Sequence, residues 1–313
     1  MKIIKILLVW LILFHKLYAN VDTLGIKEIL IKPSKTDTNI KMWDEPHQIL
    51  YRENSQPNHL ILFFQGSYGK PGGFKLFKAT ILNHENMIID LRYPNDWLTF
   101  QKCQSVLDER IFDKFRYEIF AGGNYHPTIK VDTSNSLLNR FKKLIEFLKE
   151  NENSKISFLF KDDGEIDYSK ITVAGFSQGA GMALLFGGKY PVDRIVLVSG
   201  PVDSNIVLKK VASWITDSIN LRQKQIYGFV NYKDYYYNYI KNCWYKIGMK
   251  SYNILDTTYL GNKEIVNDNR YNFTISKIKH KDGHNALLLD ENYELYNEVW
   301  RHMFKKSLII NKK

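Results

Sequence analysis

Short apolar segments that alternate with longer amphipathic ones constrain this chain more than any other feature of its sequence. Residues 60–64 (LILFF) and 87–91 (MIIDL) are continuous apolar runs, which are typical of strands buried on both faces of a sheet. Further strands of this kind are expected at 171–174, 194–199, 225–230 and 273–278. Two earlier strands, at 26–31 and 47–51, are expected to form an antiparallel start.

Helical spacing appears between these strands. Residues 135–150 carry apolar side chains three and four positions apart, and residues 291–304 close the chain with the same pattern. Strands that alternate with helices predict an α/β fold, a doubly wound and mostly parallel sheet with helices on both faces. In such sheets the active site lies beyond the carboxyl ends of the strands.

The first 19 residues have the order of a signal peptide. Two lysines lie within residues 1–5, residues 6–14 are almost wholly apolar, and Ala19 is a small residue suited to cleavage. A membrane span needs roughly 20 apolar residues, and no later segment reaches that length. We therefore expect residues 20–313 to form one exported domain, periplasmic or secreted, with a retained N-terminal anchor as the alternative.

Composition excludes several function classes. The net charge is +11, but the lysines are scattered and form no dense stripe, so nucleic-acid binding is not expected. The eight histidines show no metal-ligand spacing, and no organic cofactor or metal is expected. Cys103 and Cys243 can form one disulfide in an oxidising compartment, and the sequence leaves that open, as it does the oligomeric state.

The segment that carries chemistry is ITVAGFSQGAGMA, at residues 171–183. It places Gly175, Ser177 and Gly179 in a G-x-S-x-G pattern, after an apolar strand and before a helix rich in small residues. A strand-to-helix turn this tight strains the serine backbone and leaves no room for side chains at the two glycines. The pattern predicts a nucleophile elbow with Ser177 as the nucleophile.

At this point the chain resembles the α/β-hydrolase superfamily of the serine esterase and lipase type, and within it a group of uncharacterised exported bacterial hydrolases. The likeness rests on ITVAGFSQGAGMA, VLVSGPVD at 196–203, IYGFVNYKD at 226–234 and GHNALLLD at 283–290. These segments follow in order over most of the mature chain. One departure is Phe176, where that group often has His before the serine.

The resemblance implies a catalytic triad in the order Ser, Asp, His. His284 lies in a loop before the last predicted helix and is the expected base, ahead of His280 and His302. Asp234 follows the strand at 225–230 and is the expected acid, although an aspartate before a helix is also a common N-cap. Asp203, after the preceding strand, is the alternative acid.

The same resemblance implies an oxyanion hole built from two backbone N–H groups. One is expected from Gln178, directly after the nucleophile, and the other from the loop after the strand at 60–64, where Ser67 fits the pattern best. This loop lacks the G-K-[ST] ending of a phosphate-binding loop. Residues 235–270 are long and rich in aromatic side chains, which predicts either a lid or a core helix with aromatic packing.

From these features we expect a serine hydrolase that cleaves a small-molecule or lipid carboxylic ester through an acyl-enzyme. The alternative is a non-catalytic protein of the same fold that binds an acidic ligand on its basic surface.

Overall fold

The computed structural model describes residues 25–216, 221, 225–255, 271–276 and 279–305, so the predicted signal peptide lies outside the described residues. Within these residues one sheet holds nine strands in the order β1-β2-β4-β3-β5-β6-β9-β11-β10. The strands are β1 (Ile26–Ile31), β2 (His47–Arg52), β3 (His59–Phe64), β4 (Asn86–Asp90), β5 (Ile171–Phe176), β6 (Arg194–Val198), β9 (Gln225–Asn231), β10 (Lys250–Leu255) and β11 (Tyr271–Ser276).

The pairing confirms a mostly parallel sheet with an antiparallel start. β2 pairs antiparallel with both β1 and β4, and every other pair in the sheet is parallel. The strand β10 was not predicted, because its sequence, KSYNIL, is not a continuous apolar run. A small hairpin, β7 (Ser204–Asn205) with β8 (Lys210–Val211), lies apart from the main sheet.

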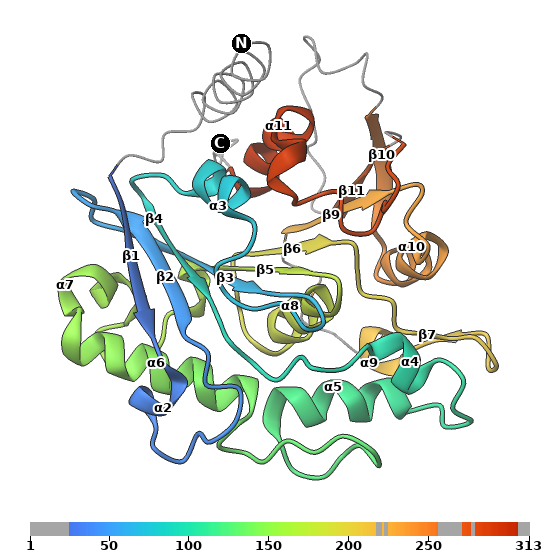
Figure 1. The fold of residues 1–313 in the computed structure, drawn as a ribbon, viewed down its shortest axis with the longest axis horizontal. Coiled ribbons are helices and arrows are strands. Elements are labelled where there is room, and N and C mark those ends of the chain that lie inside the picture. The colour runs from blue at the N-terminus through green and yellow to red at the C-terminus, as the bar shows by residue number, and fades with distance from the viewer. Residues whose placement is uncertain (1–24, 217–220, 222–224, 256–270, 277–278, 306–313) are drawn as a thin grey trace, which may run out of the picture.

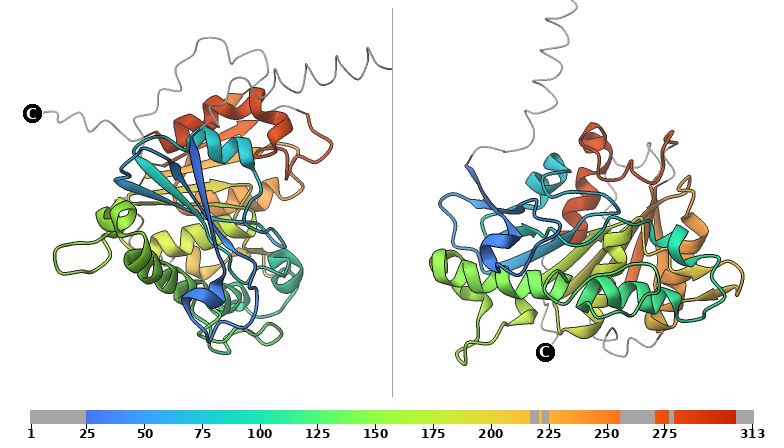
Figure 2. Two further views of the ribbon diagram at one scale, coloured as in Figure 1. Left: turned by 60° about the vertical axis from the view of Figure 1, so that its left-hand side comes forward. Right: turned by 60° about the horizontal axis from the view of Figure 1, so that its bottom comes forward.

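Helices cover both faces of the sheet, as predicted. α3 (Lys75–Ile81) and α11 (Tyr293–Phe304) lie on one face, shown at the top of Figure 1. The other face carries α5 (Ile111–Ala121), α6 (Leu137–Asn151), α8 (Gln178–Lys189) and α10 (Tyr237–Lys246). Figure 2 shows the same layers from two further directions. The short helices are α2 (Pro33–Thr36), α4 (Thr99–Cys103), α7 (Asn153–Ile156) and α9 (Ser213–Thr216).

The continuous apolar runs follow from this layering. In β3, Leu60, Leu62 and Phe64 pack into the core beneath α8, whereas Ile61 and Phe63 pack beneath α3 and α11. Successive side chains of a strand point to opposite faces, so a sheet covered on both sides needs apolar residues at every position.

The stretch predicted to be a lid or a core helix is only partly described. In α10, Trp244 is fully buried and its indole N–H donates to the Gly200 carbonyl at 2.9 Å. β10 adds an edge strand beside β11, and residues 256–270 lie outside the described residues. The described part therefore packs as a core helix and an edge strand.

No helix among the described residues is long and apolar enough to span a bilayer.

Candidate active site

Ser177 lies at a sharp turn between β5 and α8. Its backbone has φ +55° and ψ −116°, a conformation that side-chain-bearing residues rarely adopt. A Cβ added to Gly175 would lie 2.1 Å from the Gly179 carbonyl oxygen, and one added to Gly179 would lie 2.1 Å from that of Phe64. Both glycines are therefore required by close backbone contacts, which is the geometry of a nucleophile elbow.

His284 joins Ser177 to Asp234 through two hydrogen bonds. Its Nε2 lies 2.8 Å from Ser177 Oγ, and its Nδ1 lies 2.8 Å from Asp234 Oδ2. The His284 backbone is held on both sides, because its N–H donates to Asp282 Oδ1 at 3.0 Å and its carbonyl accepts from Ser199 Oγ at 2.9 Å. His284 and Asp234 are both buried, so water competes little for these bonds.

Asp234 is fixed by a second bond as well. Its Oδ1 accepts the backbone N–H of Tyr236 at 2.8 Å, just before α10 begins at Tyr237. One carboxylate therefore makes both the hydrogen bond to the backbone N–H before α10 and the contact with His284. Gly283 lies against the same loop, since a Cβ there would come within 2.7 Å of the Lys233 carbonyl carbon. This close approach brings the His284 loop onto the loop after β9.

The alternative acid, Asp203, is bound elsewhere. Its carboxylate accepts from Arg116 at 2.6 and 2.8 Å and from the Trp214 indole at 2.9 Å. Arg116, which is fully buried, also donates to the Gln178 carbonyl at 2.8 Å. Asp203 therefore stabilises the start of α8 and does not contact His284.

The two rival histidines also have other surroundings. His280 Nε2 lies 2.7 Å from the Tyr296 hydroxyl, and the His302 ring packs edge-on against Tyr227 at 5.6 Å between centroids. Burial lowers the pKa of both imidazoles below its usual value. Neither side chain contacts Ser177.

The loop after β3 also packs against Ser177. A Cβ on Gly66 would lie 3.2 Å from the Ser177 Cβ, so this loop packs directly against the elbow. Ser67 Oγ donates to Gln178 Oε1 at 2.7 Å and ties the loop to the start of α8. Among the described residues, neither the Ser67 N–H nor the Gln178 N–H has a hydrogen-bond acceptor. Two backbone donors without acceptors thus lie next to the elbow, one directly after Ser177 in the chain and one in the loop that packs against it.

Residues that sequence reasoning missed support this loop. Asn95 Nδ2 donates to the carbonyls of Gly66 and Gly69 at 2.6 and 2.8 Å, and the Tyr93 hydroxyl donates to that of Gln65 at 2.6 Å. Arg92 in turn donates to Asn95 Oδ1. Their only sequence signal is position: they directly follow the buried strand β4, at the sheet edge where the elbow lies.

A buried ion pair lies beneath the same loop. Lys78 Nζ is 2.9 Å from Asp90 Oδ2, and both side chains are almost completely buried. Gln65 Nε2 donates to the same Asp90 oxygen at 2.7 Å. The hydrophobic pattern could not indicate this pair, because the lysine comes from α3 and the aspartate from β4.

Aromatic rings line the histidine. The rings of Phe176, Tyr235 and Tyr236 lie 5.5, 5.2 and 5.3 Å from that of His284. Tyr235 is 64% exposed, and partial desolvation raises the pKa of its phenol to about 12. Phe100 of α4 packs on Tyr236 at 4.8 Å. The rings that pack around the imidazole therefore carry no charge at neutral pH.

Cys103 and Cys243 are both free and buried, and burial raises the pKa of each thiol. Within the described part of the chain, no three His, Cys, Asp or Glu side chains are arranged to hold a metal ion.

No protein-family model and no curated protein sequence matches the chain. Among solved structures, the chain is similar to esterase B from Lactobacillus rhamnosis, described with a tributyrin phosphonate, at 9% identity and a TM-score of 0.47; the match covers 96% of this chain and 94% of that one. It is similar to a dienelactone hydrolase from Anabaena variabilis at 12% identity, with a TM-score of 0.45 and coverage of 89% and 99%. For a candidate dipeptidyl aminopeptidase IV from Bacteroides ovatus the identity is 14% and the TM-score 0.46, and the chain spans 37% of that protein's length.

The chain's own architecture carries the fold assignment. The first two sheet pairings are antiparallel and the rest parallel, β5 leads through a strained serine into α8, and the aspartate and histidine follow in later loops. These features identify the chain as a protein of the α/β-hydrolase fold.

Proposed function

We propose that this protein is a serine hydrolase that cleaves a carboxylic ester through an acyl-enzyme. The observation that carries the proposal is the continuous chain of hydrogen bonds from Asp234 through His284 to Ser177. A free serine hydroxyl is a weak nucleophile at neutral pH, and an adjacent base that is itself oriented by a carboxylate is what activates it.

The proposed reaction proceeds in two halves. His284 Nε2 takes the proton of Ser177 Oγ as the oxygen attacks the ester carbonyl, and Asp234 stabilises the imidazolium that forms. The tetrahedral oxyanion would accept from the N–H groups of Ser67 and Gln178, and loss of one such donor typically costs about 10²–10³ in turnover. His284 then protonates the leaving alcohol. In the second half, His284 takes a proton from water as the water attacks the acyl carbonyl, the bond between the acyl group and Ser177 Oγ breaks, and His284 returns the proton to Oγ as the acid leaves.

The test compares wild type with Ser177→Ala on p-nitrophenyl esters from acetate to palmitate, together with labelling by a fluorophosphonate probe. Ser169→Ala is the matched control, because Ser169 is exposed and bonds only Asp167. We expect wild type and Ser169→Ala to turn over an ester and to label, and Ser177→Ala to do neither. If wild type neither reacts nor labels, the alternative, a binding protein for an acidic ligand, replaces the esterase proposal.

Export is part of the proposal and rests on the sequence of residues 1–19. Mass spectrometry of the protein recovered from cells that express the full chain should find a mature N-terminus at Asn20. Recovery of the intact N-terminus from the membrane fraction would favour the retained anchor.

A further inference from the structure

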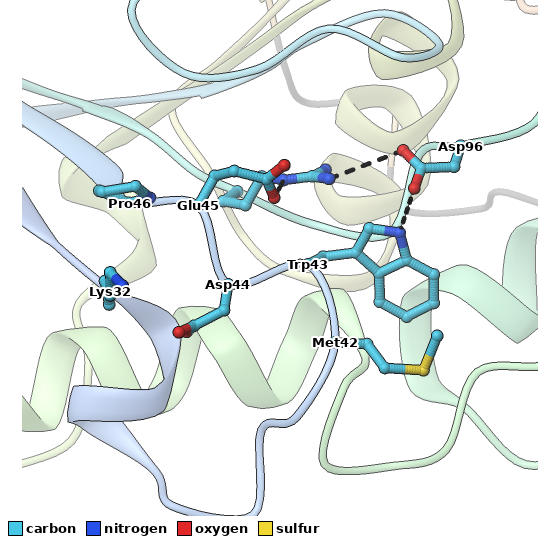
Figure 3. A pocket seen from close by; sticks show the side chains of 8 residues that line it. Lys32, Met42, Trp43, Asp44, Glu45, Pro46 and Asp96 are labelled. Atoms are coloured by element: carbon cyan, nitrogen blue, oxygen red, sulfur yellow. Dashed lines mark hydrogen bonds and ion pairs between the residues drawn. The ribbon is translucent and has the colours of Figure 1, made fainter.

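A cavity lies on the same edge of the sheet as Ser177. It has a volume of about 620 Å³, and its lining includes Met42, Trp43, Asp44, Glu45, Arg92 and Asp96 (Figure 3). Because β2 is antiparallel to β4, with Gln48 opposite Asp90, the residues before β2 lie at the carboxyl end of β4. Three strand spacings separate β2 from β5, roughly 14 Å along the sheet edge.

Trp43 is held in this cavity by an unusual backbone. Its φ is +50°, in the left-handed region that bulky residues avoid. Buried Arg140 donates to the carbonyls of both Met42 and Trp43, which fixes the strained turn. The indole N–H donates to Asp96 Oδ2 at 2.6 Å, so the ring is anchored at its polar edge as well. A strained residue secured in this way points to a function for its side chain.

Two of the three carboxylates of the cavity are compensated by cations, and the third, Asp44, is bound by a neutral serine. Glu45 lies between Arg92 Nε at 2.9 Å and Lys70 Nζ at 2.6 Å. Asp96 accepts from Trp43 and lies 3.6 Å from Arg92 Nη2, and Asp44 accepts from the N–H and hydroxyl of Ser34. A cationic ligand would have to compete with Arg92 and Lys70 for the oxygens of Glu45 and Asp96. Hydroxyl groups, in contrast, can donate to the remaining lone pairs without disturbing the ion pairs.

We infer that this cavity binds a neutral carbohydrate ring. The C–H face of a sugar packs on an indole, and its hydroxyls suit the paired carboxylates and guanidinium beside it. Figure 3 shows Trp43 and Asp96 on one side of the cavity and Asp44 and Lys32 on the other.

The cavity is connected to the candidate active site by the loop after β3. Lys70 of that loop contacts Glu45, and Arg92 contacts Asn95, which holds the loop at Gly66. On the proposed function, the bound sugar is a remote part of the ester substrate, and the ester bond lies about three strand spacings away at Ser177. The substrate class is therefore an oligosaccharide that carries an ester.

The binding test uses the full chain with Ser177→Ala, so that no ester can be cleaved, and titrates cellotetraose, xylotetraose and chitotetraose by calorimetry and tryptophan fluorescence. We expect at least one of them to bind, and Trp43→Ala to weaken that binding at least tenfold. Asp96→Asn, which keeps the size of the side chain, should weaken it several-fold. Tyr245→Ala, an exposed aromatic residue of α10, is the matched control and should bind as before.

Binding of none of the three sugars, or equal binding by Trp43→Ala, would overturn the inference. So would tetramethylammonium binding more tightly than any sugar, since that result would show a cation site.

A second measurement separates this inference from the proposed function. With an active Ser177, Trp43→Ala should raise KM for an O-acetylated form of the oligosaccharide that binds and leave KM for p-nitrophenyl acetate unchanged, because the small ester does not reach the cavity. An equal effect on both substrates contradicts the sugar site. Sugar binding without any esterase activity would refute the proposed function and leave the cavity assignment intact.

Discussion

The substitution Asp234→Asn tests the proposed triad at the carboxylate that contacts His284. Asp234 has two buried contacts: Oδ1 accepts the Tyr236 N–H and Oδ2 accepts His284 Nδ1, each at 2.8 Å. Asparagine fills the same space but has only one oxygen. The backbone N–H of Tyr236 is an obligatory donor, so it should keep that oxygen and turn the amide nitrogen toward His284.

The size of the effect follows from these contacts. An amide nitrogen facing Nδ1 forces the imidazole proton onto Nε2, where it points at Ser177 Oγ and blocks proton transfer. The reverse amide orientation leaves two buried donors facing each other, which costs about 1–3 kcal/mol. Loss of a charged hydrogen bond to the imidazolium costs about 1.5–3 kcal/mol more. The sum, about 2.5–6 kcal/mol, corresponds to a loss of about 10²–10⁴ in kcat/KM.

The assay is kcat/KM on the best p-nitrophenyl ester, with thermal unfolding measured on the same samples. Asp203→Asn is the comparison, because it leaves the buried Arg116 without its counter-ion and should destabilise the fold by about 3–5 kcal/mol. Below its melting temperature this variant should retain more activity than Asp234→Asn. A folded Asp234→Asn enzyme within tenfold of wild type would refute the reasoning, as would a folded Asp203→Asn enzyme that is the less active of the two.

Three further predictions follow from particular contacts. Gly179→Ala should abolish soluble expression or lower the melting temperature sharply, because its Cβ would lie 2.1 Å from the carbonyl oxygen that ends β3; expression and melting curves check this. Cys103 and Cys243 should resist iodoacetamide at pH 8 until denaturant is added, since burial raises both thiol pKa values, and mass spectrometry would detect early alkylation. The hydrogen bond from Lys70 lowers the pKa of Glu45 from 4.5 to about 2, so its stabilising contribution is present above pH 4.5 and is lost as the pH falls toward 2. Urea unfolding of Glu45→Gln should therefore depend less on pH in that range than unfolding of wild type, and equal slopes would contradict the assignment.

Much of the fold could be predicted because strands that are buried on both faces of a sheet need continuous apolar runs, and such runs are visible in the sequence. The apolar runs of β3, β5 and β6 were recognisable without any tertiary information, as was the strand-turn-helix context of Ser177. β10 was not predicted, because its sequence, KSYNIL, shows little alternation of apolar and polar residues and only a short apolar run. The candidate site was predictable to the same extent, through residues that adjoin recognisable strands.

The sequence by itself determined the buried strands of the sheet, the strained turn at Ser177 and the candidates for its partners, because these depend on local periodicity and on glycines at fixed spacing. Only the tertiary structure shows that His284 contacts Asp234 and that Asp203 is bound by Arg116 of α5 instead, because both aspartates follow a strand and their partners come from distant parts of the chain. The support of the loop after β3 by Asn95 and the cavity at Trp43 likewise join segments far apart in the chain. Such contacts depend on how the strands are ordered in space, and no single segment of the sequence specifies that order.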